Sequence, residues 1–205
     1  MKYPDTINDL IECFKKLPSI GEKTAERLAL STITMDDKTI ELFSNSLKNI
    51  KTKIKKCDKC NNLTEDTLCS VCKNKNRNSE MLCIVESAKD VKLIENNNIY
   101  NGYYYVLQNL ISPSNGLDPS SIEIDRIINL IKENDVKEVI IAIKPNVEGE
   151  TTALYISKLL EKYDVIVSRI ALGIPIGAEI DYVDSLTLEM AIENRKVINN
   201  KKENF

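Results

Sequence analysis

The chain has 205 residues, with 28 lysine and arginine residues, 31 aspartate and glutamate residues and no histidine. The missing histidine excludes Ser-His-Asp and Cys-His catalysis, and no apolar run is long enough to span a bilayer. The net charge of −3 hides an asymmetry, since residues 1–79 carry 15 basic and 11 acidic residues (+4) and residues 80–205 carry 13 and 20 (−7).

The chain opens with the pattern of an amphipathic helix that ends near Pro18. Thr6 and Asp9 have the spacing of a capping box, which marks the start of a helix. Apolar residues then recur at helical spacing, at Ile7, Leu10, Ile11, Phe14 and Leu17.

Two more helices are expected before the first cysteine pair. One begins near Glu22 and buries Ala25, Leu28 and Ala29. The next follows Asp36, and its apolar stripe is expected to be buried; the stripe consists of Ile40, Phe43, Leu47, Ile50 and Ile54.

The turn between the first two helices, within residues 17–28, is a candidate DNA-binding hairpin. Gly21 lets a partner approach the backbone, and the free amides at the next helix N-terminus can bind a phosphate oxygen. Lys23 and Arg27 are four residues apart, so they share one helix face and can both reach a DNA backbone without reading its base sequence. The turn lacks the glycine directly before lysine that a nucleotide-binding P-loop needs. A plain helical corner remains the alternative.

Four cysteines form two pairs with two-residue gaps, Cys57 with Cys60 and Cys69 with Cys72. This spacing lets four thiolates complete a tetrahedral shell, which predicts one structural Zn²⁺ per chain because a catalytic zinc keeps one position open. Two disulfides are an alternative, but the N-terminus lacks a signal-peptide pattern, so we expect a cytoplasmic, reducing environment. An iron–sulfur cluster is a second alternative, although paired knuckles at this spacing more often hold zinc.

The remaining cysteines and the lysines near the quartet have simpler interpretations. Cys13 and Cys83 lie in apolar surroundings and are expected to be buried thiols. Six lysines crowd the approach to the quartet, at positions 48, 51, 53, 55, 56 and 59. They suit a polyanion such as nucleic acid, with a solvated helix face as the alternative.

From residue 81 the pattern changes to that of an α/β fold with a mostly parallel sheet. Residues 81–85 and 139–143 are short apolar runs rich in β-branched residues, separated by a helical pattern around residues 124–131. Residues 164–170 are a further strand candidate after a helix at residues 150–163. A final helix is expected from Asp184, fading into a charged tail at residues 199–205.

Several motifs together resemble the RecR family of bacterial recombination proteins, in the family's order and over nearly the whole chain. They are the hairpin, the cysteine quartet, and residues 105–107, 110–113, 147–156 and 184–188. The resemblance implies a helix-hairpin-helix DNA-binding domain (residues 1–54), a four-cysteine zinc finger (55–79), a Toprim domain (80–175) and a C-terminal Walker-B-like segment with a tail (176–205). It also implies a nucleoid-associated homotetrameric ring that binds single- and double-stranded DNA.

RecR-like proteins act with RecO, and in many bacteria with RecF, to load recombinase at single-stranded gaps. The resemblance maps DNA contacts to Lys23 and Arg27, and contacts with RecO to Glu86, Glu148 and Glu150. The alternative for these glutamates is a favourable interaction with a helix dipole, worth about 0.3–1 kcal/mol each.

The Toprim region departs from the pattern of Toprim enzymes, which pair a glutamate at a strand end with an Asp-x-Asp motif to hold Mg²⁺. Lys144 and Asn146 stand at the Asp-x-Asp positions, and an ammonium group there repels a divalent cation. The sequence therefore predicts a non-enzymatic DNA-repair scaffold. The alternatives are a metal-dependent Toprim enzyme acting on DNA phosphodiesters and a zinc-finger adaptor that binds only protein.

Overall fold

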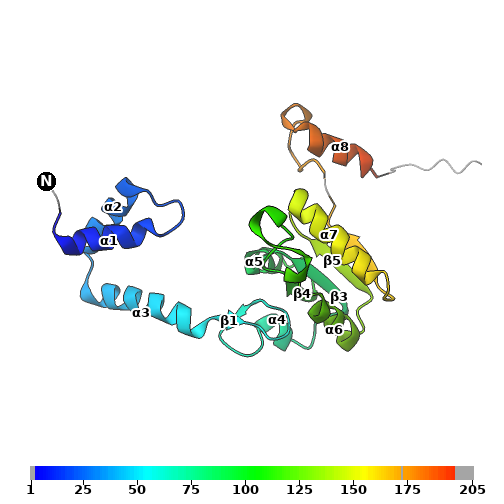
Figure 1. The fold of residues 1–205 in the computed structure, drawn as a ribbon, viewed down its shortest axis with the longest axis horizontal. Helices are drawn as coiled ribbons and strands as arrows, with labels where there is room; N and C mark the ends of the chain where they lie inside the picture. The colour runs from blue at the N-terminus through cyan, green and yellow to red at the C-terminus, as the bar shows by residue number, and fades with distance from the viewer. Residues whose placement is uncertain (1–2, 172, 197–205) are drawn as a thin grey trace, which may run out of the picture. The chain divides into compact units, whose positions relative to one another are not determined.

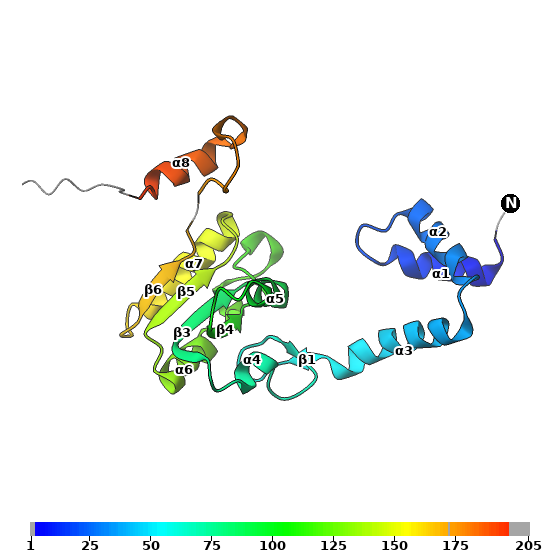
Figure 2. The same ribbon diagram turned by 180° about the vertical axis from the view of Figure 1, so that it is seen from behind.

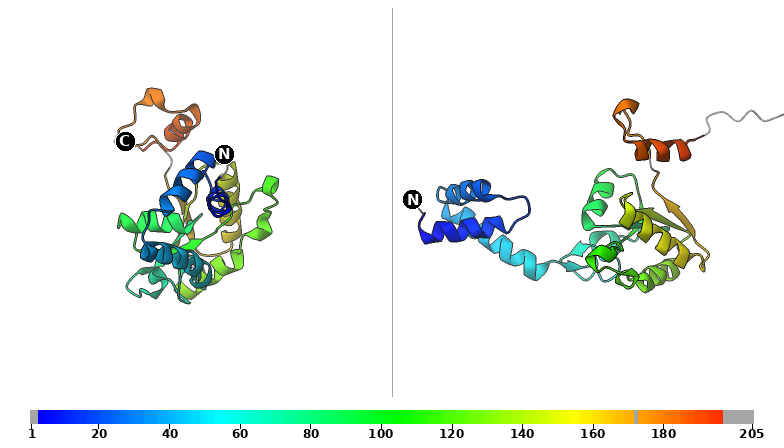
Figure 3. Two further views of the ribbon diagram at one scale, coloured as in Figure 1. Left: turned by 90° about the vertical axis from the view of Figure 1, so that its left-hand side faces the viewer. Right: turned by 45° about the horizontal axis from the view of Figure 1, so that its top comes forward.

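The computed structural model describes residues 3–171 and 173–196, and the chain divides after Ile54 into two compact units (Figure 1). In the first unit, α1 (Asp5–Lys15) and α2 (Glu22–Thr32) lie side by side (Figures 2 and 3). Ile11, Ala25 and Ala29 form their small core, and Leu28 is only half-buried.

The start of α1 differs from the prediction. The helix begins directly after Pro4 and has no side-chain cap, so the capping box expected at Thr6 and Asp9 is wrong. The carbonyl oxygen of Pro4 accepts hydrogen bonds from the amides of Ile7 (2.9 Å) and Asn8 (3.2 Å). Thr6 therefore lies inside the helix and is not its N-cap.

The third helix, α3 (Asp37–Lys53), has the expected start but not the expected burial. The Asp36 side chain caps it by accepting a hydrogen bond from the Thr39 amide at 3.0 Å. Its apolar stripe lies in the open, with Ile40, Phe43, Leu47 and Ile50 between 37% and 59% exposed and Ile54 half-buried. The expectation of a buried stripe is wrong for Ile40, Phe43, Leu47 and Ile50, because no helix among described residues 3–54 covers this face.

The second unit contains a four-stranded parallel sheet in the order β4-β3-β5-β6, which confirms the predicted α/β class. The strands are β3 (Asn78–Val85), β4 (Gly102–Val106), β5 (Glu138–Ala142) and β6 (Ile166–Arg169). They alternate with α5 (Ala88–Asn96), α6 (Ile124–Asn134) and α7 (Val147–Leu160), and short 3₁₀ turns, η1 (Pro113–Asn115) and η2 (Pro119–Ser121), lie between β4 and α6. Helix α7 begins three residues earlier than predicted, because Asn146 caps it.

The two faces of the sheet build two separate cores, since successive strand residues point to opposite sides. Leu82 and Ile84 pack with α6 and α7. Cys83 and Val85 pack with α5 and with the cysteine finger, whose elements are β1 (Lys55–Lys56), antiparallel β2 (Leu63–Thr64) and α4 (Ser70–Lys73). Burial raises the pKa of Cys83 to about 12, as suits the predicted buried thiol, whereas Cys13 is exposed and that prediction is wrong.

The C-terminal segment contains η3 (Ile180–Tyr182) and α8 (Ser185–Glu193). Helix α8 begins where predicted, after Asp184, and has no buried residue. The predicted tail at residues 199–205 lies outside the described residues. Among the helices that the structure describes, none is long and apolar enough to cross a membrane.

Candidate metal centre and nucleic-acid interface

The four predicted metal ligands meet in one cluster. The sulfur atoms of Cys57, Cys60, Cys69 and Cys72 all lie within 4.8 Å of one another, and the first three residues are buried. The Cys60 and Cys69 Sγ atoms are 3.6 Å apart, which is close to the edge of about 3.8 Å for a tetrahedron of thiolates around Zn²⁺. This donor set fits a closed, structural metal site.

The electrostatics of the cluster also favour a cation. The pKa of Cys60 is raised, first by its contact with Cys69, and the pKa of Cys72 is raised, first by its contact with Cys60. The pKa of Cys69 is lowered, because the neighbouring thiol of Cys60 donates to its thiolate. An ionised Cys69 therefore disfavours ionisation of Cys60 and Cys72, and a bound Zn²⁺ would favour the thiolate form of all four ligands by placing two positive charges among them.

The metal cluster is joined to the sheet by a polar network that sequence reasoning missed. Asn61 follows the first knuckle and is only 3% exposed. Its side-chain amide donates to Tyr105 Oη (3.1 Å) and to Glu123 Oε2 (2.7 Å), and accepts from Arg126 Nη1 (2.6 Å). Hydrogen bonds from Asn61, Tyr105 and Arg126 to Glu123 lower the pKa of this carboxyl, with the Asn61 contact as the largest cause.

The predicted DNA-binding hairpin presents its residues to solvent. Gly21 is the N-cap of α2, no side chain caps the helix, and a Cβ added at Gly21 would meet no atom within 4 Å. Lys23 and Arg27 are exposed, and neither has an ion-pair or hydrogen-bond partner among the residues that the structure describes. Lys15 instead pairs with Glu12 and Glu22, both at 2.7 Å. The two cations and the open helix N-terminus are therefore available to an anion.

The three predicted partner-binding glutamates each have a partner within the chain. Glu86 follows β3 directly, and its Oε1 accepts from Lys144 Nζ at 2.9 Å. Glu148 and Glu150 lie in the first turn of α7, where Glu148 accepts from Ser112 Oγ and Glu150 pairs with Arg169.

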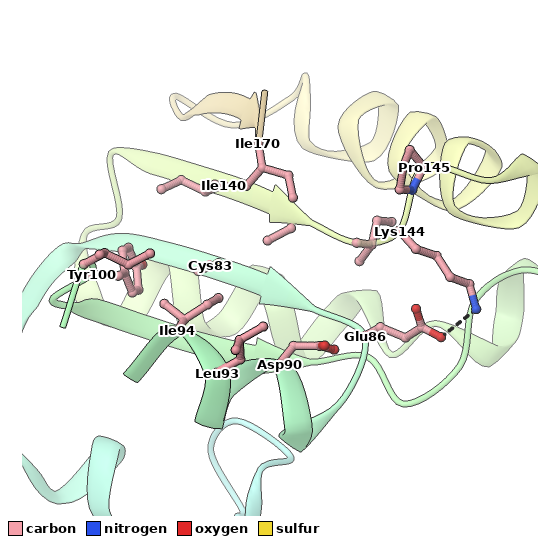
Figure 4. A pocket seen from close by; sticks show the side chains of 13 residues that line it. Cys83, Glu86, Asp90, Leu93, Ile94, Tyr100, Ile140, Lys144, Pro145 and Ile170 are labelled. Atoms are coloured by element: carbon pink, nitrogen blue, oxygen red, sulfur yellow. Dashed lines mark hydrogen bonds and ion pairs between the residues drawn. The ribbon is translucent and has the colours of Figure 1, made fainter. Parts of the chain in front are cut away.

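Glu86 and Lys144 close one end of an apolar hollow of about 550 Å³ (Figure 4). The Glu86 carboxylate raises the pKa of Lys144, so the cation persists at neutral pH. The apolar walls include Leu93, Ile94, Tyr100, Ile140 and Ile170.

Comparison with known proteins places these sites in one family. Family models match four successive stretches, described as the RecR helix-hairpin-helix (residues 7–51), the RecR zinc finger domain of four cysteines (54–74), the Toprim domain (80–171) and the C-terminal part of RecR (173–196). Recombination protein RecR of Clostridium perfringens strain 13 is 45% identical over 196 residues, covering 96% of this chain and 98% of the relative. Recombination protein RecR of Staphylococcus saprophyticus is 41% identical over 195 residues, covering 95% and 98%. The chain belongs to the RecR family.

Each candidate site lies in the stretch that matches the corresponding RecR or Toprim model. The hairpin cations are in the helix-hairpin-helix stretch, the quartet is in the zinc-finger stretch, and the glutamates are in the Toprim stretch. The zinc-finger match and the clustered sulfurs agree on a metal site made of four cysteines.

The Toprim stretch of this RecR chain has the residue types that weaken magnesium binding. Lys144 places its ammonium against Glu86, where a Toprim enzyme needs carboxylates around a divalent ion. Asn146 has a structural role, because its Oδ1 accepts from the Gly149 amide at 2.9 Å and caps α7. A Cβ at Gly149 would lie 1.9 Å from the Lys144 carbonyl oxygen, so glycine is required for this tight helix start.

The C-terminal stretch that was predicted to be Walker-B-like uses Asp184 structurally. Both carboxylate oxygens of Asp184 bind Thr187, one accepting from the amide at 3.0 Å and one from the hydroxyl at 2.7 Å. These hydrogen bonds lower the pKa of Asp184, with the side-chain hydroxyl as the largest cause. Asp184 therefore acts as the N-cap of α8.

Proposed function

We propose that this RecR-family chain is a DNA-binding scaffold of recombinational repair that acts with RecO, and with RecF where present, to load recombinase at single-stranded gaps. The observation that carries the proposal is the hairpin at the start of α2, where Gly21 is open and Lys23 and Arg27 are exposed without partners in the described residues. These groups recognise phosphates, so binding is independent of base sequence on both single- and double-stranded DNA.

The test is DNA binding by the double variant Lys23→Ala, Arg27→Ala over a range of salt. Losing two phosphate contacts on duplex DNA should reduce the slope of log affinity against log salt by about 1.8 per engaged chain. Lys158→Ala with Lys162→Ala is the matched control, because these lysines are also exposed and four residues apart. An unchanged slope in the folded hairpin variant rejects the hairpin as the DNA site.

We further propose that the quartet holds one structural Zn²⁺ per chain and that the Toprim domain is catalytically silent. The closed four-sulfur cluster supports the first point, since four protein ligands leave no position for water or substrate. The Lys144–Glu86 pair supports the second, because the ammonium group occupies the position where a magnesium ion would need a carboxylate.

Glu86, Glu148 and Glu150 are the proposed docking site for a basic surface of RecO. The net charge of −7 over residues 80–205 supports this, because such a surface steers a basic partner and raises the association rate. Glu148→Gln is the sharpest test, since it removes the charge but keeps an oxygen that accepts from Ser112 Oγ. RecO association should be slower, most strongly at low salt, with DNA binding by the hairpin unchanged. Equal association rates for both proteins contradict the docking site.

We also propose a homotetramer with the four domains at residues 1–54, 55–79, 80–175 and 176–205, working at the nucleoid. Two exposed apolar surfaces support self-association: the α3 stripe and the side chains of the C-terminal segment. The latter include Ile176, Ile180, Tyr182, Leu186 and Ile192, which are at least 58% exposed. The mass of the assembly, measured by light scattering with and without DNA, tests the stoichiometry.

A further inference from the structure

The cysteine finger and the sheet are joined by two hydrogen bonds, one at the outer edge of β4 and one just after this strand. The Cys60 carbonyl oxygen accepts from the Val106 amide at 2.9 Å, and the Asn61 carbonyl oxygen accepts from Gln108 Nε2 at 3.3 Å. Strand β4 is an edge strand, so the finger satisfies part of an edge that would otherwise be unpaired. The predicted metal ligand Cys60 and its neighbour Asn61 are therefore hydrogen-bonded to the sheet region as well as being part of the finger.

Asn61 extends this junction with its side chain, and its own position is set by the first knuckle. The Asn61 amide donates to the Cys57 carbonyl oxygen at 3.0 Å. The backbone has φ +61°, a left-handed conformation that asparagine tolerates better than most residues. A shift of the first knuckle, Cys57 to Cys60, would therefore also shift the buried side-chain amide of Asn61. Both N–H donors and the oxygen of this amide are hydrogen-bonded.

The partners of Asn61 lie at the two ends of the β4–α6 connection, residues 107–123. Tyr105 precedes this connection on β4, whereas Glu123 and Arg126 stand at the start of α6. The middle of the connection is fastened to α7, where the Ile111 amide donates to Thr152 Oγ1 at 2.8 Å and Ser112 Oγ donates to Glu148. Asn61 thus holds together both ends of a segment that contacts the start of α7.

We propose that Asn61 is a positioning residue that couples metal occupancy of the quartet to the order of the β4–α6 connection. Without the metal, the first knuckle loses its constraint, and Tyr105 and Glu123 lose the buried donor that the knuckle presents. Coupling of this kind is reciprocal, so loosening the junction also weakens metal binding. The proposal concerns the metal and the sheet alone and does not depend on DNA or RecO.

Asn61→Gly is the test variant, because glycine accepts the positive φ and only the side chain is lost. Asn98→Gly is the matched control, since Asn98 also has a positive φ (+51°) but is exposed and lies after α5. In competition with a chromophoric chelator, Asn61→Gly should bind Zn²⁺ roughly 10- to 100-fold more weakly than the unmodified protein, as for other residues that orient metal ligands. Asn98→Gly should bind it equally well.

Hydrogen exchange followed by mass spectrometry supplies the second readout. In the unmodified protein and in Asn98→Gly, removing zinc should speed exchange in residues 104–123. In Asn61→Gly this segment should exchange fast with zinc bound and change little on its removal. If Asn61→Gly does not fold, Tyr105→Phe replaces it as the test variant, because this change deletes only the hydroxyl. It should weaken zinc binding and speed exchange in residues 104–123, as expected for Asn61→Gly.

The proposal is overturned if zinc removal leaves exchange in residues 104–123 of the unmodified protein unchanged. It is equally overturned if Asn61→Gly, or Tyr105→Phe in its place, retains both the zinc affinity and the exchange pattern of Asn98→Gly. A protein that binds no zinc at all contradicts the proposed metal site instead, so the two failures are distinguishable.

Discussion

The Lys144–Glu86 pair predicts how the Toprim domain responds to magnesium. The informative change is Lys144→Asp with Asn146→Asp, which restores the Asp-x-Asp pattern of Toprim enzymes beside Glu86. Aspartate is as good an N-cap as asparagine, so the start of α7 should survive the second substitution. Without magnesium, the change replaces an ion pair by facing carboxylates. Because the Lys144 and Glu86 side chains are 48% and 30% exposed, the loss of stability should stay within about 1 kcal/mol.

Magnesium should then stabilise the variant but not the unmodified protein. If the restored site has a dissociation constant of about 1 mM, 10 mM Mg²⁺ stabilises the folded state by about 1.4 kcal/mol. For a unit of this size, that corresponds to a rise of roughly 3–6 °C in the melting temperature. The unmodified protein should show no rise beyond that produced by NaCl of equal ionic strength.

Thermal unfolding followed by circular dichroism is the assay, with Lys144→Ala as the control. This control removes the cation without adding a carboxylate, so it separates relief of repulsion from creation of a ligand. The reasoning is refuted if the unmodified protein gains as much from magnesium as the double variant. A variant that folds but gains nothing shows that the cation alone does not explain the missing site.

Three further predictions concern single substitutions. Gly21→Ala should change the free energy of unfolding by less than about 1 kcal/mol, since the added Cβ meets no atom within 4 Å. It should nevertheless weaken DNA binding, because the methyl group stands where a phosphate approaches. Equal DNA affinity of the variant and the unmodified protein in a binding titration contradicts this prediction. Arg77 donates two hydrogen bonds to Glu95, of 2.7 and 2.9 Å, and lowers the pKa of this carboxyl. The ion pair therefore stabilises the folded state at pH values above the ordinary pKa of glutamate. This stabilisation is lost as the pH falls through the lowered pKa of Glu95. Acid denaturation curves of the unmodified protein should therefore be steeper below about pH 4.5 than those of Glu95→Gln, and parallel curves contradict the assignment. Cys60→Ser should lose zinc, measured by elemental analysis, together with thermal stability.

Features that depend on residues close together in the sequence can be predicted from the spacing of those residues. The two cysteine pairs predict the metal cluster because a two-residue gap brings both sulfurs of a pair to one side of a turn. The apolar β-branched runs likewise predict β3 and β5, since strands of a parallel sheet are buried on both faces.

The Asn61 network could not be read in this way. Its side chain forms hydrogen bonds with residues that are 44, 62 and 65 positions away in the sequence. These residues come within hydrogen-bonding distance only when the finger packs against β4. An asparagine after a cysteine knuckle gives only the hint of a left-handed turn. Which groups then reach its side chain depends on the whole α/β topology.

Helix α3 shows a different limit. The periodicity predicts this helix correctly, but the predicted burial of its apolar stripe is wrong. Periodicity identifies the face of a helix that avoids water, but it carries no information about which molecule covers that face. Phe43 and Leu47 are about half exposed, and no described helix of residues 3–54 buries them. The same pattern that specifies the helix thus supports self-association of the RecR chain, and replacing Leu47 by glutamate should act on assembly mass before it acts on the α1–α2 core.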